Sequence, residues 1–244
     1  QQEVPLVDLT ALSDGTVDPS GLDALILDTA LGFVPDYATA EGLGVPIIED
    51  ISHGLGAVSG ERRAGTVGRF VLAGLESDHI VTAGGGAAAL AASNKRRTAL
   101  RKVAGGLPQE CILPDMNAAL AETQIREIDS FLERRGELCE HLEKAVGRSR
   151  HRLPVQPDEA GRVPYSAPVL VESAIGDVVS YAKKHGVESR AAFEESIIGA
   201  YEDLETEGLP NARAFALRCV QFPLYPMLSR SELQQLQRVL TTLP

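Results

Sequence analysis

The stretch from Val45 to Asn94 decides the fold, and it reads VPIIEDISHGLGAVSGERRAGTVGRFVLAGLESDHIVTAGGGAAALAASN. It opens with a short apolar run, Val45 to Ile48, which closes on Glu49 and Asp50. Such a run is typical of a buried strand in a parallel sheet, and ligands of open α/β sheets bind at the carboxyl ends of these strands. The pattern therefore predicts a strand that carries the Asp50 carboxylate to the edge of a ligand site.

The second half of the stretch predicts another strand and a turn. The apolar run Arg69 to Leu75 is followed by a polar corner, Glu76 to His79, and then by three glycines, Gly84 to Gly86. These glycines have neither the spacing of a dinucleotide-binding fingerprint nor that of a phosphate-binding loop. We therefore interpret them as a tight turn between strands.

Outside this stretch, short strands and helices alternate, which is typical of a parallel α/β sheet. The expected elements, in chain order, are a strand at 5–9, a helix that starts at 18–20, a strand at 30–34, a helix at 36–43, a helix at 95–103 and one long helix at 115–146. We expect the strand at 30–34 to be the parallel neighbour of the Val45 strand, with Asp50 at the carboxyl edge of the sheet.

The Pro-, Gly- and Arg-containing segment 148–168 is interpreted as a linker, which divides the chain into domains at 1–147 and 148–244. The second domain is expected to be α+β. Its predicted elements are a strand at 169–172, a helix at 175–185, a short strand from Val187, a helix at 210–219, an extended segment at 220–225 and a final helix. Ser229 and Glu232 have the spacing of a capping box at the start of that helix.

Composition narrows the classes of function. A formal charge of −11 disfavours nucleic acid or an anionic membrane as partner, and the basic clusters at 95–97 and 148–152 are interpreted as solvated faces. Three dispersed cysteines without C-x-x-C spacing indicate buried thiols in a reducing compartment, here the cytoplasm, and no zinc site. The acidic residues between 194 and 207 have no metal-binding spacing either.

Four blocks of the sequence, in order along the chain, together resemble the DegT/StrS-type sugar aminotransferases. They are IEDISHGLGA, GGGAA, PDMNAALAETQIREIDSFLERR and CVQFPLYPMLSRSELQQL. The resemblance implies a pyridoxal phosphate (PLP) enzyme of the aspartate aminotransferase fold type I, with a large α/β domain and a small α+β C-terminal domain. It also implies a homodimer with active sites at the subunit interface, and amino-group transfer to a keto sugar attached to a nucleotide.

Residue by residue, the resemblance assigns candidate cofactor contacts. Asp50 matches the aspartate that pairs with the pyridine nitrogen, where a carboxylate keeps the nitrogen protonated and makes the ring an electron sink. His53 falls where the family has a Gln or His against the ring face. Ser77, in the polar corner, is a further candidate for cofactor contact.

The sequence departs from the family at the lysine that holds PLP as a Schiff base. Alignment on Gly85 and Gly86 places Asp78 at that position, and counting from Gly65 places His79 there, whereas the first lysine of the chain is Lys95. A carboxylate cannot form an imine. The phosphate-binding serine of the family falls at about Ala73, and the family's N-terminal part is missing, so that this is either a fragment or a natural short form.

These departures favour a degenerate, inactive family member, a pseudoenzyme that acts as a binding or partner scaffold and binds PLP weakly or not at all. One alternative is a nucleotide-sugar aminotransferase or 3-dehydratase that uses His79 as its base; another is a site completed by a separate chain. We further expect a homodimer or a tight partner chain. If Asp78 faces Asp50 across the pocket, one of the two carboxyls should have a raised pKa.

Overall fold

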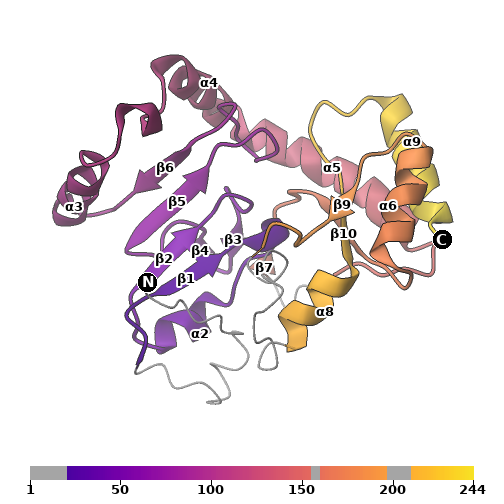
Figure 1. Cartoon of the computed structure of the whole chain (residues 1–244), viewed down its shortest axis with the longest axis horizontal. Helices are drawn as coiled ribbons and strands as arrows, with labels where there is room; N and C mark the ends of the chain where they lie inside the picture. Colours follow the sequence, from indigo (N-terminus) through magenta and orange to yellow (C-terminus); the bar gives the residue numbers. More distant parts are fainter. Residues whose placement is uncertain (1–20, 155–159, 197–209) are drawn as a thin grey trace. The chain divides into compact units, whose positions relative to one another are not determined.

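The computed structural model describes residues 21–154, 160–196 and 210–244, and Figure 1 shows their secondary structure. These residues form two compact units. The sheet unit contains residues 21–133 and 160–165, and the C-terminal unit contains the rest. The division therefore falls inside a helix, between residues 133 and 134, and not at residue 147 as the linker composition indicated. The expected elements at 5–9 and 18–20 lie outside the described residues.

A four-stranded mixed sheet with the order β1-β2-β5-β6 forms the centre of the sheet unit. The strands β1 (Leu25–Asp28), β2 (Ile47–Asp50) and β5 (Phe70–Gly74) are parallel, and β6 (Ala87–Leu90) runs antiparallel to β5. Asp28 pairs in register with Asp50. The prediction that Asp50 lies at the carboxyl edge of a parallel sheet is confirmed.

The location of the strand that precedes β2 was predicted wrongly. Leu25–Asp28, which was expected to be helical, is β1, and the expected strand at 30–34 is instead a 3-10 turn, η2 (Ala30–Gly32). Leu31 and Gly32 have positive φ angles, which end any extended run there. In so short a segment, apolar spacing fits a helix and a strand equally well, and pairing with β2 decides the outcome.

The helix α2 (Tyr37–Gly42) lies between β1 and β2 in sequence and confirms the predicted helix at 36–43. Asp36 caps its N-terminus, since the Asp36 carboxylate accepts hydrogen bonds from the amides of Ala38 and Thr39. Gly44, with φ +68, then turns the chain into β2.

A second, three-stranded sheet brings a distant segment back to the sheet unit. Its order is β4-β3-β7, formed by β3 (Val58–Ser59), β4 (Arg62–Arg63) and β7 (Ala160–Gly161). After β7, the Val163 amide donates to Gly32 O at 3.0 Å. We call residues 160–165 the return segment. Its pairing with β3 explains why the expected linker does not separate two domains cleanly.

The predicted long helix at 115–146 is two helices, α4 (Asp115–Arg126) and α5 (Ile128–Val146), with a break at Glu127. Side chains of α4 fix its position, because the Gln124 amide bonds both the N–H and the carbonyl of Thr82. The helix α5 continues into the C-terminal unit, where residues from Leu138 onward are buried. The two parts of the predicted helix therefore pack against different partners, although their sequence pattern is continuous.

The helix α3 (Asn94–Ala104), predicted at 95–103, follows β6, and a 3-10 turn, η3 (Gln109–Cys111), separates it from α4. No residue of α3 is buried. In Figure 1, β6 leads away from the sheet toward α3. Across the described residues, no helix is both long and apolar enough to cross a membrane.

The C-terminal unit is α+β, as predicted. Its antiparallel sheet has the order β8-β10-β9, with β8 (Ala167–Leu170), β9 (Arg190–Ala191) and β10 (Cys219–Phe222). Helices α6 (Ile175–Lys184), α8 (Pro210–Arg218) and α9 (Arg230–Thr242) complete the unit. The capping box at Ser229 and Glu232 is confirmed, whereas Val187 is a buried core residue and not the start of a strand.

Candidate functional site

The candidate site lies at the carboxyl edge of the main sheet, where three parallel strands end in Asp28, Asp50 and Gly74. Asp28 lies beside Asp50 because β1 and β2 are in parallel register. Asp28 is exposed at the surface, but desolvation of its carboxyl at the end of β1, together with the negative charge of Asp50, raises the pKa of Asp28 to about 6. A raised carboxyl pKa was expected for a pair of Asp50 and Asp78, but the structure assigns it to Asp28, which the sequence analysis did not single out.

Asp50 is held by Ser52, two residues further along the chain. The Ser52 amide and hydroxyl donate to Asp50 Oδ1 at 2.9 and 2.5 Å, and Ser52 Oγ accepts from the Gly74 amide at 2.7 Å. Asp50 Oδ2 remains available to a donor at this edge, since the bonds from Ser52 both go to Oδ1. Sequence reasoning missed Ser52, although its position beside a strand-end aspartate was a usable signal.

Three aromatic rings meet next to this carboxylate. The His53 ring stacks on the Tyr165 ring with centroids 3.9 Å apart and planes 20° apart. His79 meets His53 edge-on, with centroids 5.4 Å apart. Both histidines are fixed through Nδ1, which accepts from the Leu31 amide in His53 and from the Glu76 amide in His79. A neutral imidazole bound in this way carries its proton on Nε2.

Gly74 makes room for the His79 ring. A Cβ atom at position 74 would lie 2.3 Å from His79 Cε1 and 2.9 Å from Ser52 Oγ, which no real side chain allows. The glycine thus permits both the ring position and the Ser52 network. The sequence analysis treated this residue only as part of an apolar run.

The polar corner contributes unequally to the site. Asp78 Oδ2 accepts a hydrogen bond from the Tyr165 hydroxyl at 3.1 Å, so Asp78 is joined to the ring cluster through a residue of the return segment. Ser77 is exposed, and none of the described hydrogen bonds or ion pairs involves it. Tyr165 lies 87 positions from Asp78 in the chain, and no sequence motif indicated that the two would meet.

Glu49, which precedes Asp50 at the end of β2, binds backbone amides of the loop before β5. Its side chain is 1% exposed and accepts hydrogen bonds from the amides of Gly65, Val67 and Gly68. Burial, followed by the charge of Glu49, raises the pKa of Tyr37. Glu49 therefore holds the loop before β5 and does not face the candidate site as Asp50 does, because successive strand residues point to opposite faces.

None of the strands that end at the carboxyl edge of the main sheet carries a lysine in the part of the chain that the structure describes. All five are on helices: Lys95 and Lys102 on α3, Lys144 on α5, and Lys183 and Lys184 on α6. Within the sheet unit, α3 follows β6, and β6 runs from Ala87 beside Gly74 to Leu90 beside Val71. Since β6 runs away from the edge that holds Asp50, α3 with its two lysines follows the end of β6 that is farther from that edge.

These observations test whether the site fits PLP. Asp50 is suitably placed for a pyridine nitrogen, because a carboxylate oxygen is available at the strand end. Within the described residues of the sheet unit, a lysine that could form the imine is missing from this edge, and one face of the His53 ring is covered by Tyr165. The residues present do not fit a lysine-bound cofactor.

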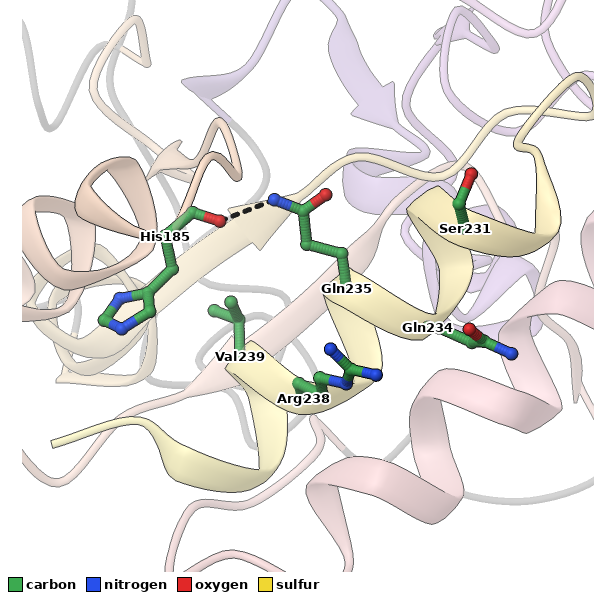
Figure 2. Close-up of a pocket in the computed structure, with 6 residues that line it drawn as sticks. All are labelled: His185, Ser231, Gln234, Gln235, Arg238 and Val239. Carbon is green, nitrogen blue, oxygen red and sulfur yellow. Dashed lines mark hydrogen bonds between the residues drawn. The ribbon is translucent and has the colours of Figure 1, made fainter.

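A shallow pocket of about 410 Å³ lies in the C-terminal unit, between α9 and the end of α6 (Figure 2). Its lining residues are His185, Ser231, Gln234, Gln235, Arg238 and Val239. Gln235 Nε2 donates to His185 O at 2.6 Å, which satisfies a carbonyl at the C-terminus of α6. This hydrogen bond joins α9 to the C-terminus of α6. The pocket has a polar lining because it is formed by this helix end and by the solvent-facing side of α9.

Comparison with known proteins identifies the architecture. The model of the DegT/DnrJ/EryC1/StrS aminotransferase family matches residues 36–243. Spr1654 from Streptococcus pneumoniae, provisionally described as a sugar aminotransferase and solved in its PMP form, has a TM-score of 0.81 at 17% identity, covering 96% of this chain and 70% of that one.

Two further solved structures give the same result. DesV from S. venezuelae, in complex with a ketimine intermediate, has a TM-score of 0.80 at 20% identity, covering 96% of this chain and 68% of DesV. A DegT DnrJ EryC1 StrS aminotransferase from Brucella abortus has a TM-score of 0.75 at 18% identity, with coverages of 95% and 68%. No curated protein sequence matches. At these identities the likeness establishes the PLP-transferase fold.

Proposed function

Because the chain belongs to the DegT/DnrJ/EryC1/StrS aminotransferase family, we propose that it is a member that does not transaminate, and that it serves as a binding or partner scaffold in sugar metabolism. One observation carries the proposal. In the described part of the sheet unit, the carboxyl edge that holds Asp50 has no lysine, and the two lysines of this unit lie on α3, which follows the far end of β6. Aspartate and imidazole side chains cannot form the imine that amino-group transfer by this family requires.

The proposal predicts how the purified protein responds to added PLP. We expect no imine absorbance band near about 420 nm, because that band belongs to a cofactor joined to a lysine. We also expect that borohydride treatment followed by peptide mass mapping labels none of the five lysines above the level of a heat-denatured control. A specifically reduced adduct on Lys95 or Lys102 would refute the proposal.

A second candidate function is an enzyme that uses His79 as its base, with or without a second chain that completes the site. The position of His79 favours it, since the ring is 5.4 Å from His53 and its Nδ1 is fixed by the Glu76 amide. Histidine is the side chain that most often serves as a general base. Turnover of a nucleotide-linked keto sugar that is abolished by His79→Asn would favour this function over the scaffold.

As partner we propose a second copy of the chain or a tight partner chain. Support comes from α3 and α4, which have one buried residue between them, Ala121. Large apolar side chains on this part of the sheet unit are exposed: Val103 70%, Leu107 52%, Ile112 61%, Met116 82%, Leu120 48% and Ile125 52%. Monomers rarely expose large apolar patches, so many exposed apolar side chains along two successive helices favour a covering partner.

Light scattering checks this association. We expect a mass of at least twice 26.0 kDa at micromolar concentration. We expect Met116→Glu combined with Leu120→Glu to shift the protein toward the monomer, because each charge would have to be desolvated at the interface. Glu122→Gln, at a solvated position of the same helix, is the matched control. A stable wild-type monomer would contradict the proposal.

We further propose that the protein works in the cytoplasm and takes a nucleotide sugar as its ligand. The cysteines support the first part, since the three of them are dispersed along the chain without C-x-x-C spacing, as is common in proteins of a reducing compartment. The second part rests on family membership alone.

A further inference from the structure

Tyr165 is held by several contacts, although it lies outside any helix or strand. It is 3% exposed, its ring lies 3.9 Å from the His53 ring, and its hydroxyl donates to Asp78. Its amide also donates to Val163 O at 2.7 Å. Stacking, a hydrogen bond and near-complete burial therefore fix both the plane and the direction of the ring.

The backbone around Tyr165 packs closely against η2. Gly32 has φ +80, and a Cβ atom there would lie 2.0 Å from Val163 O and 3.2 Å from Tyr165 Cβ. The Arg162 guanidinium lies over the Phe33 ring at 5.0 Å. The return segment thus packs against η2, and this packing places the Tyr165 ring beside His53.

The Tyr165 ring covers one face of the His53 ring, on which a planar ligand could otherwise stack. His53 offers a flat imidazole face within three residues of Asp50, whose Oδ2 can pair with a protonated ring nitrogen. Aromatic rings bind such a face by offset stacking at centroid distances of about 4.5–7 Å, and the Tyr165 ring is already closer than that. A second ring cannot occupy the same face.

We propose that Tyr165 is a built-in occupant of a ring-binding site on His53, so that a planar pyridine-type ligand binds there only when the tyrosine ring is removed or displaced. The inference rests on the proposed non-catalytic role in one respect: the site is taken to bind a ring without forming an imine. It makes Tyr165 the specificity-determining residue of this site.

Equilibrium binding of pyridoxamine 5′-phosphate tests the proposal, because this probe carries an amine and cannot form an imine with a lysine. We expect Tyr165→Ala to bind the probe about tenfold or more tightly than the wild type, since one ring is exchanged for another on the same face. Tyr165→Phe, which keeps the ring and loses the Asp78 bond, should behave like the wild type. Tyr225→Ala, at an exposed tyrosine of the C-terminal unit, is the matched control.

Two outcomes overturn the proposal: wild-type affinity equal to that of Tyr165→Ala, or Tyr165→Phe binding as tightly as Tyr165→Ala. If the alanine variant unfolds, Tyr165→Leu fills the volume without a flat ring and is expected to show the same gain. In the wild type, millimolar probe should leave the NMR signals of the His53 ring unchanged, and a saturable shift would count against the tyrosine as occupant. The two proposals fail separately: borohydride trapping of a PLP imine on a lysine would refute the proposed function, whereas the comparison of probe affinity between the wild type and Tyr165→Ala decides this inference.

Discussion

Replacing Glu49 with glutamine is expected to destabilise the sheet unit by about 3 kcal/mol, because a buried carboxylate that satisfies several amides is lost. Glu49 Oε1 accepts from Val67 and Gly68, and Oε2 accepts from Gly65. An amide group offers one acceptor oxygen and turns two N–H donors toward amides that are donors themselves. At least one buried amide therefore has no partner in the variant.

Urea unfolding measures the change in the free energy of unfolding, and hydrogen exchange locates it. The amides of Gly65, Val67 and Gly68 should exchange faster in Glu49→Gln than in the wild type, because their acceptor is lost. Glu41→Gln is the control, since Glu41 forms an ion pair with Arg62 in which both side chains are 43% exposed. That change should cost about 0.5 kcal/mol. Equal losses in the two variants would show that Glu49 does not hold the loop.

Gly32→Ala is expected to release the return segment. The new methyl group would overlap Val163 O, and alanine at φ +80 is strained wherever it stands. Overpacking costs about 1–3 kcal/mol and the left-handed conformation about 1–2 kcal/mol. We expect a total loss of about 3 kcal/mol, together with displacement of Tyr165 from His53.

Trypsin provides the local measurement, because the return segment contains Arg162. Cleavage after Arg162 should be faster in Gly32→Ala than in the wild type. Gly60→Ala is the control that has the backbone strain without the steric overlap. Gly60 has φ +58, and a Cβ atom added there would meet no other atom within 4 Å. The free energy of unfolding of this variant should fall by about 1 kcal/mol, and trypsin should cleave it at the wild-type rate. Unchanged cleavage in Gly32→Ala would show that the return segment is not seated by this contact.

The sequence alone determined the family, the fold class and the place of Asp50. A short apolar run that closes on two acids is typical of a buried strand in a layered α/β sheet, and the acids then stand at the end of that strand. Asp36, Ser229 and Glu232 likewise act within a few residues of their own positions, so their capping roles could be predicted. The absence of lysine before Lys95 needed no structure at all.

Tertiary structure decided which side chains meet at the site. Asp28 lies beside Asp50 because two strands pair in register, although the local spacing around Leu25 also fitted a helix. Tyr165 reaches His53 because β7 pairs with β3, a contact between segments about a hundred residues apart. Local patterns report burial and turns over a few residues, whereas pairings of distant segments depend on the packing of the whole unit. Periodicity therefore located the strand end that carries Asp50, and only the folded sheet showed which ring covers the adjacent histidine.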